Sequence, residues 1–238
     1  MIKHTDNPAG RLFLILKKAQ SINKQSKMRT AWAEILEVDP KNTAKLLKKI
    51  GKVNQLPSDI KSRVEAIDDE DHELYLRRLD KVEQALGSLN LNSRWDNFLN
   101  IIDETTVSSV EFTSNLLSKK NGEKGLSEKQ INELLEITKK FKKELIDSAI
   151  PEAIKKFILE RLNSIEGAIH DYKISGIKPI EIEIERSVGS FFMRRGIYNK
   201  EPKWGNRFLE FITKIATFVS FANDGQALIG NAMKLLKN

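Results

Sequence analysis

The chain has 238 residues, of which 40% are apolar and 31% charged, with 12 Gly, 6 Pro and no Cys. This composition is that of a folded globular protein, and the low glycine and proline content favours long helices over a sheet with many tight turns. The absence of cysteine excludes disulfide frameworks, thiolate zinc sites, iron–sulfur clusters and cysteine nucleophiles.

The net charge of +7 is distributed unevenly along the chain. Residues 1–60 hold 12 Lys and Arg against 5 Asp and Glu, residues 61–190 hold 20 against 25, and residues 191–238 hold 8 against 3. Two basic ends around a mildly acidic middle suggest a nucleic acid, an acidic partner, or contacts between the ends and the middle. The polar start of the chain lacks the apolar core of a signal peptide, so we expect a cytoplasmic protein.

The first 67 residues predict four helices. Asn7-Pro8 is a cap followed by a proline and begins the first helix, and Thr30 to Leu36 forms a short second one. Asp39-Pro40 is a second start of the same kind. Pro57-Ser58 is expected to break that helix, with a short helix following to Ile67.

The middle of the chain predicts two longer helices and a linker. Leucines at helical spacing predict a helix over about 72–89. Ser93 is expected to cap the next helix, which reaches Leu116, and the β-branched stretch 105–110 suggests a kink within it. Residues 119–125 form the clearest linker. Ser127 and Gln130 then match a capping box, which begins a helix ending near Ile146.

The last third of the chain also reads as helical. Pro151 begins a helix that ends near Tyr172, with Gly176 as its stop signal. The alternating stretch 180–185 resembles a strand, but Pro179 and the glutamates that follow it favour a helix start. The final predicted helices run from Trp204 to Phe221 and from Gln226 to Leu236.

These elements predict an all-α fold, a bundle of roughly eight to ten helices. The helices could form one continuous domain or two packed sub-bundles over residues 1–120 and 126–238. The expected core includes large apolar residues of both halves: Trp95, Phe98, Ile102, Phe141, Phe157 and Leu162.

No motif indicates catalysis or cofactor binding. Glycine-rich phosphate loops, a nucleophile elbow and a zinc-binding helix motif are all missing from the sequence. None of His4, His72 and His170 stands at metal-ligand spacing with another histidine. We therefore expect no enzyme, no cofactor, no metal site and no small-molecule substrate.

Two surfaces stand out in the pattern. The first is a lysine stripe on one helix face, interpreted either as a site for nucleic-acid phosphates or as a solvated face: Lys41, Lys45, Lys48, Lys49 and Lys52. The second is a broad apolar face near the C-terminus, interpreted as core, as a surface for a protein partner, or as a membrane-lying helix: Trp204, Phe208, Phe211, Ile215 and Phe218.

Several stretches resemble a set of uncharacterised bacterial helical proteins of similar length. They are residues 7–12, 30–35, 71–76, 157–160 and 169–172, and the resemblance covers most of the chain. It implies no known activity, and it suggests a bacterial defence or mobile-element setting.

The leading functional hypothesis is a non-enzymatic interaction protein. It would be an adaptor, inhibitor or regulatory subunit in a bacterial multi-component system, with a protein partner or self-association. The alternatives are a nucleic-acid-binding protein using the lysine stripe and a membrane-associating effector using the C-terminal helix.

Overall fold

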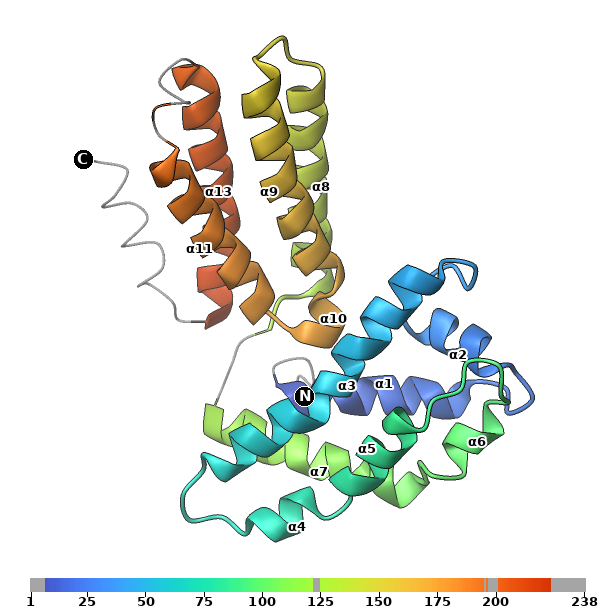
Figure 1. Cartoon of the computed structure of the whole chain (residues 1–238). Helices are drawn as coiled ribbons and strands as arrows, with labels where there is room; N and C mark the ends of the chain where they lie inside the picture. Colours follow the sequence, from blue (N-terminus) through green and yellow to red (C-terminus); the bar gives the residue numbers. More distant parts are fainter. Residues whose placement is uncertain (1–6, 122–124, 195, 197–200, 224–238) are drawn as a thin grey trace. The chain divides into compact units, whose positions relative to one another are not determined.

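A computed structural model describes residues 7–121, 125–194, 196 and 201–223. Among these residues the regular elements are helices, apart from one isolated backbone bridge between Lys27 and Arg94. Nine helices of the described chain have eight residues or more, which confirms the expected all-α fold. The chain divides into two compact units (Figure 1). Unit 1 is Met1–Glu123 with Lys173–Gly176, and unit 2 is Lys124–Tyr172 with Ile177–Asn238.

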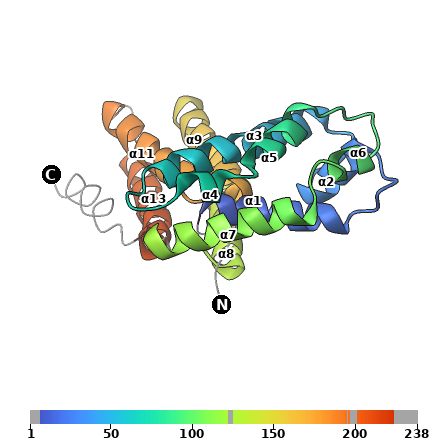
Figure 2. The same cartoon turned by 90° about the horizontal axis from the view of Figure 1, so that it is seen from below.

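Unit 1 is built around its first helix, α1. This helix packs against α2, α3 and α7 (Figures 1 and 2), and nine of its residues are buried. A helix buried around most of its circumference is a central helix. The helices of unit 1 are α1 (Pro8–Ser21), α2 (Met28–Ile35), α3 (Thr43–Glu65), α4 (His72–Leu76), α5 (Leu79–Gly87), α6 (Asp96–Leu99) and α7 (Glu104–Asn121).

The cap predicted for α1 is confirmed and has a second role. The side chain of Asn7 accepts a hydrogen bond from the backbone N–H of Gly10, 2.9 Å away. Its amide nitrogen also donates to the Ser114 carbonyl and the Ser118 hydroxyl of α7. One buried asparagine therefore begins α1 and binds it to α7.

Two of the expected boundaries around α3 are wrong. Asp39 caps a turn instead of a helix, and α3 begins at Thr43 because Asn42 accepts a hydrogen bond from the N–H of Lys45. Pro57 does not break the chain and lies buried inside α3. The apolar stripe of α3 continues on both sides of Pro57, and its burial offsets the lost backbone hydrogen bond.

The two helices expected in the middle of the chain are each interrupted. The helix predicted over 72–89 is divided at Arg77 and Arg78 into α4 and α5. The two parts differ in burial, since α4 buries no residue and α5 buries four. The helix predicted from Ser93 ends early, and α7 begins after Asp103, which accepts hydrogen bonds from the N–H and hydroxyl of Thr106. The β-branched stretch 105–110 therefore lies inside an uninterrupted helix.

Unit 2 is a four-helix bundle in which consecutive long helices run in opposite directions (Figure 1). Each helix contacts the next, and the last returns to the first. The helices are α8 (Glu128–Ile146), α9 (Glu152–His170), α11 (Lys178–Met193) and α13 (Pro202–Asn223). The short α10 (Tyr172–Ser175) stands between α9 and α11 in the sequence, and all but its first residue belong to unit 1.

The start signals of unit 2 are confirmed. Ser127 and Gln130 form the predicted capping box at the start of α8. Pro179 stands in the first turn of α11, and the alternating stretch that follows it is helical. The expected core residues are buried, but in two separate clusters. Trp95, Phe98 and Ile102 belong to unit 1, and the cluster of unit 2 contains Phe141, Phe157 and Leu162.

The segment Lys173–Gly176 belongs to unit 1 although the residues on both sides of it belong to unit 2. Nε of the buried Arg11 donates to the carbonyl of Ile174, 3.0 Å away. Gly176 ends the segment with φ +70°, a backbone conformation that favours glycine. The helix expected over Gln226–Leu236 lies outside the described residues.

Candidate interaction surfaces

The histidines occupy structural or solvated positions. Nε2 of His72 lies 2.8 Å from the carbonyl oxygen of Ile67, so this ring joins the start of α4 to the preceding loop. His170 is exposed, 4.0 Å from Glu166, and His4 lies outside the described residues. Within the described parts of the chain, no group of three or more His, Asp and Glu side chains could hold a metal ion.

The apolar face near the C-terminus lies in the core of unit 2. Trp204, Phe208, Phe211 and Ile215 are buried, and Phe218 is half-buried against the same cluster. The interpretation of the first four as a partner or membrane surface is therefore wrong. Their spacing reflects a helix that closes a four-helix bundle. None of the helices in the described residues is both long and apolar enough to cross a bilayer.

The structure divides the predicted lysine stripe. Lys45 and Lys48 on α3, and Lys41 just before it, are exposed, whereas Lys49 and Lys52 are half-buried. Nζ of Lys49 donates to the Leu36 carbonyl, 3.1 Å away, at the end of α2. Lys49 is therefore a structural residue that satisfies a helix C-terminus, and its place in a binding stripe is a wrong expectation.

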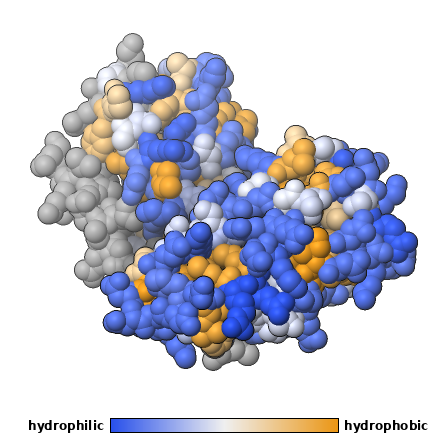
Figure 3. Space-filling view, turned by 60° about the horizontal axis from the view of Figure 1, so that its bottom comes forward, coloured by the Kyte–Doolittle hydropathy of each residue, from blue (hydrophilic) through white to orange (hydrophobic). Residues whose placement is uncertain are grey.

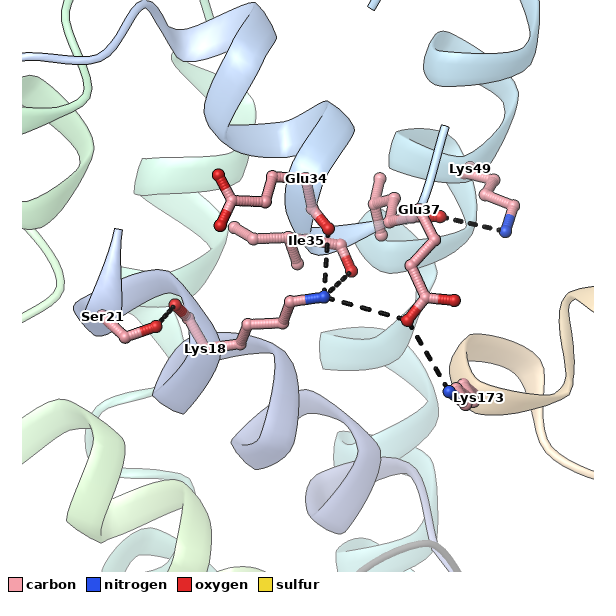
Figure 4. A network of polar contacts seen from close by, with 8 residues as sticks. Lys18, Ser21, Glu34, Ile35, Glu37, Lys49 and Lys173 are labelled. Atoms are coloured by element: carbon pink, nitrogen blue, oxygen red, sulfur yellow. Dashed lines mark hydrogen bonds and ion pairs between the residues drawn. The ribbon is translucent and has the colours of Figure 1, made fainter. Parts of the chain in front are cut away.

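Lys49 belongs to a polar network around the end of α2 (Figure 4). Nζ of Lys18 donates to the carbonyls of Glu34 and Ile35, at 3.0 and 3.1 Å. The Glu37 carboxylate lies 3.9 Å from Lys18 and 3.6 Å from Lys173. The ammonium groups of Lys18 and Lys49 thus satisfy the last carbonyls of α2. The Glu37 carboxylate connects α1 with the segment Lys173–Gly176.

The three exposed lysines of the stripe extend a larger basic area. Nη1 of Arg29 donates to the Pro40 carbonyl and the Thr43 hydroxyl, at 3.3 and 2.9 Å, and so connects the start of α2 with the start of α3. Lys24 and Lys27 precede Arg29 and are exposed. We define the basic surface of unit 1 by these cations: Lys24, Lys27, Arg29, Lys41, Lys45 and Lys48.

The basic surface is little neutralised. None of its six cations forms an ion pair with a carboxylate of the described chain. The exposed Asp39 lies two residues before Lys41 in the sequence. The first turn of α3 contains no acidic residue, and Lys45 stands in that turn. A cation at the positive end of a helix dipole destabilises the helix, so the charge of Lys45 does not contribute to the stability of α3.

The loop beneath the basic surface is held rigidly. Backbone hydrogen bonds join residues 24–29 to residues 91–96, including Met28 N–H to the Ser93 carbonyl and Trp95 N–H to the Ser26 carbonyl, both 2.8 Å. Beneath them, the rings of Trp32 and Trp95 meet edge to face at 5.6 Å and are fully buried. The cations therefore lie on a preorganised framework whose aromatic side chains are inside the core.

A second surface lies on α4 and α7. Tyr75 and Phe112 stack in parallel, with ring centroids 5.0 Å apart. Phe112 is 48% exposed, and the neighbouring Leu74 is 41% exposed. On the face of the molecule drawn in Figure 3, patches of hydrophobic residues lie among largely hydrophilic ones. We define the apolar surface as Leu74, Tyr75 and Phe112.

The apolar surface has a fixed backbone and an acidic border. The Thr113 hydroxyl of α7 donates to the Tyr75 carbonyl, 2.7 Å away, so α4 is attached to α7 directly beneath the aromatic pair. Burial and the nearby Glu70 carboxylate raise the pKa of the Tyr75 phenol. Four exposed carboxylates precede or adjoin these residues in the sequence: Asp68, Asp69, Asp71 and Glu73.

Neither surface could be recognised as a unit from spacing alone. The apolar surface combines residues 74–75 of α4 with residue 112 of α7, which are far apart in the sequence. Comparisons with protein families, curated proteins and solved structures find no match to this chain.

Proposed function

We propose that this chain is a non-enzymatic interaction protein, an adaptor, inhibitor or regulatory subunit, and that its apolar surface binds a protein partner. The observation that carries the proposal is the stacked Tyr75–Phe112 pair, which remains at the surface of unit 1 next to an exposed Leu74. A large apolar side chain that stays in contact with water contributes little to folding. A contiguous exposed group of them is typical of a protein-binding site.

The border of the apolar surface indicates the chemistry of the partner. Exposed carboxylates at Asp68, Asp69, Asp71 and Glu73 precede or flank the aromatic pair. A partner with an apolar centre and a basic rim would match this arrangement. Aromatic residues frequently dominate the binding energy of such sites, whereas rim charges mainly accelerate association.

The proposal is tested by comparing the wild type with a Leu74→Ser/Phe112→Ser double variant as bait in affinity purification. A protein bound through the apolar surface should be retained by the wild type and lost from the double variant. Titration of the purified partner should then show affinity weakened by about 2 kcal/mol or more. Both changes replace exposed side chains, so the thermal melt should change by only a few degrees.

Ile146→Ser is the matched control, because Ile146 is 52% exposed but lies in unit 2. It removes a similar exposed apolar area and should leave binding intact. A partner retained equally by the wild type and both variants would contradict the proposal. Light scattering on the purified protein identifies the case in which the partner is a second copy of the chain.

A further inference from the structure

We propose that the basic surface of unit 1 binds the phosphate backbone of duplex nucleic acid without reading its sequence. Six cations gather there from the loop before α2, the start of α2 and the start of α3. This site is separate from the apolar surface and carries a different chemistry.

Charge complementarity selects a polyanion as the partner. The six cations form no ion pairs with carboxylates of the described residues, and the charge at Lys45 opposes the dipole of α3. Apart from Arg29, which joins the starts of α2 and α3, folding does not account for these cations, whereas contact with an external anion does. Lys and Arg side chains that neutralise phosphates release condensed counterions, and this release drives non-specific binding to nucleic acid.

The shape of the site favours a duplex over other polyanions. The cations come from three chain segments that share one rigid framework, so they can contact several phosphates at once. Single-stranded nucleic acid is usually held by stacking on exposed aromatic rings, and here Trp32 and Trp95 are buried. A membrane surface would require apolar side chains that insert between lipids, and Leu47 is the large exposed apolar residue next to these cations.

The test measures binding of the full chain to a fluorescent duplex DNA of mixed sequence by anisotropy, over a range of salt concentrations. Contacts from Lys41, Lys45 and Lys48 alone predict a log–log slope of about −2.7, which is a weakening of about fortyfold between about 50 and 200 mM salt. The Lys41→Glu/Lys45→Glu/Lys48→Glu variant should bind about a hundredfold more weakly at low salt and lose most of this slope.

Two controls separate a specific surface from general charge and from misfolding. Lys129→Glu/Lys140→Glu/Lys143→Glu changes three exposed lysines of α8 and lowers the net charge equally, but should retain affinity within about threefold. The first triple variant should melt no lower than the wild type, because a glutamate at position 45 faces the positive end of the dipole of α3.

Several outcomes would overturn the proposal. They are absence of duplex binding at low salt, equal loss in both triple variants, and tighter binding to single strands that the α3 variant does not affect. Binding to vesicles containing phosphatidylserine without binding to duplex DNA would assign the surface to a membrane instead.

Discussion

The guanidinium of Arg11 lies directly over the α-carbon of Gly176, although the two residues are 165 positions apart in the sequence. A β-carbon added to Gly176 would stand 2.7 Å from Nη1 of Arg11. The same arginine donates to the carbonyl of Ile174. The absence of a side chain at Gly176 thus allows Arg11 to bind the backbone of the returning segment.

Gly176→Ala should destabilise unit 1 by about 2–4 kcal/mol, because a β-carbon is strained at φ +70° and would also displace Arg11. Urea denaturation followed by tryptophan emission in a Trp204→Phe background measures this loss, since Trp32 and Trp95 belong to unit 1. Gly51→Ala is the control, because Gly51 lies inside α3 of unit 1. It has open space around its β-position, so alanine there should stabilise unit 1 by about 0.5–1 kcal/mol.

Lys49 and Lys48 are adjacent lysines that should respond differently to replacement. Lys49→Met removes the ammonium group that satisfies the Leu36 carbonyl and should lower the free energy of unfolding by about 1 kcal/mol. Lys48→Met changes an exposed side chain and should stay within about 0.5 kcal/mol of wild type. Urea midpoints of both variants test the difference. Equal effects would show that Lys49 is not a capping residue.

Phe211→Asp should unfold the bundle of unit 2. The Phe211 ring is 5% exposed and stacks on Phe141 at 5.0 Å, so a carboxylate there would be buried without a partner. The expected cost is about 3–5 kcal/mol. Hydrogen exchange should show loss of protection in α8, α9, α11 and α13. Lys214→Asp, at an exposed position one turn away on α13, should leave that protection unchanged.

Asp103 should make the stability of unit 1 sensitive to acid. Hydrogen bonds from the hydroxyl and N–H of Thr106, followed by the hydrogen bond from Lys81, hold the pKa of this carboxyl well below its usual range. Because the pKa is lower in the folded state, the ionised carboxylate stabilises the folded protein at pH values above the unfolded pKa of about 4. This stabilisation is lost as the pH falls toward the folded pKa. Urea midpoints measured from neutral pH into acid should therefore fall more steeply in wild type than in Asp103→Asn. Parallel curves would contradict the assignment.

Local signals predicted the starts of several helices because the groups involved are close in sequence. Asn7 and Gly10, like Ser127 and Gln130, lie three positions apart, and both caps formed as expected. Pro57 shows the limit of this reasoning. A proline weakens a helix locally, but the apolar side chains on both sides of it face one core, and their burial decides the outcome.

The candidate surfaces could be predicted only in part. The spacing of Lys41, Lys45 and Lys48 was visible in the sequence, and these residues are exposed. Spacing could not reveal that Lys49 is used by the end of α2, or that Arg29 connects two helix starts. The pairing of Tyr75 with Phe112 likewise depends on a tertiary contact between helices. Such contacts depend on how helices pack against one another, and the periodicity of a single helix does not show which helix lies next to it.

The return of residues 173–176 to unit 1 has a consequence for the order of events during synthesis. An N-terminal unit can usually complete its folding while the rest of the chain is still being translated. Here, the Ile174 carbonyl that Arg11 binds is made only after α8 and α9 have been synthesised. The nascent N-terminal unit must therefore wait for much of the chain that follows it, exposed in the meantime to chaperones and proteases.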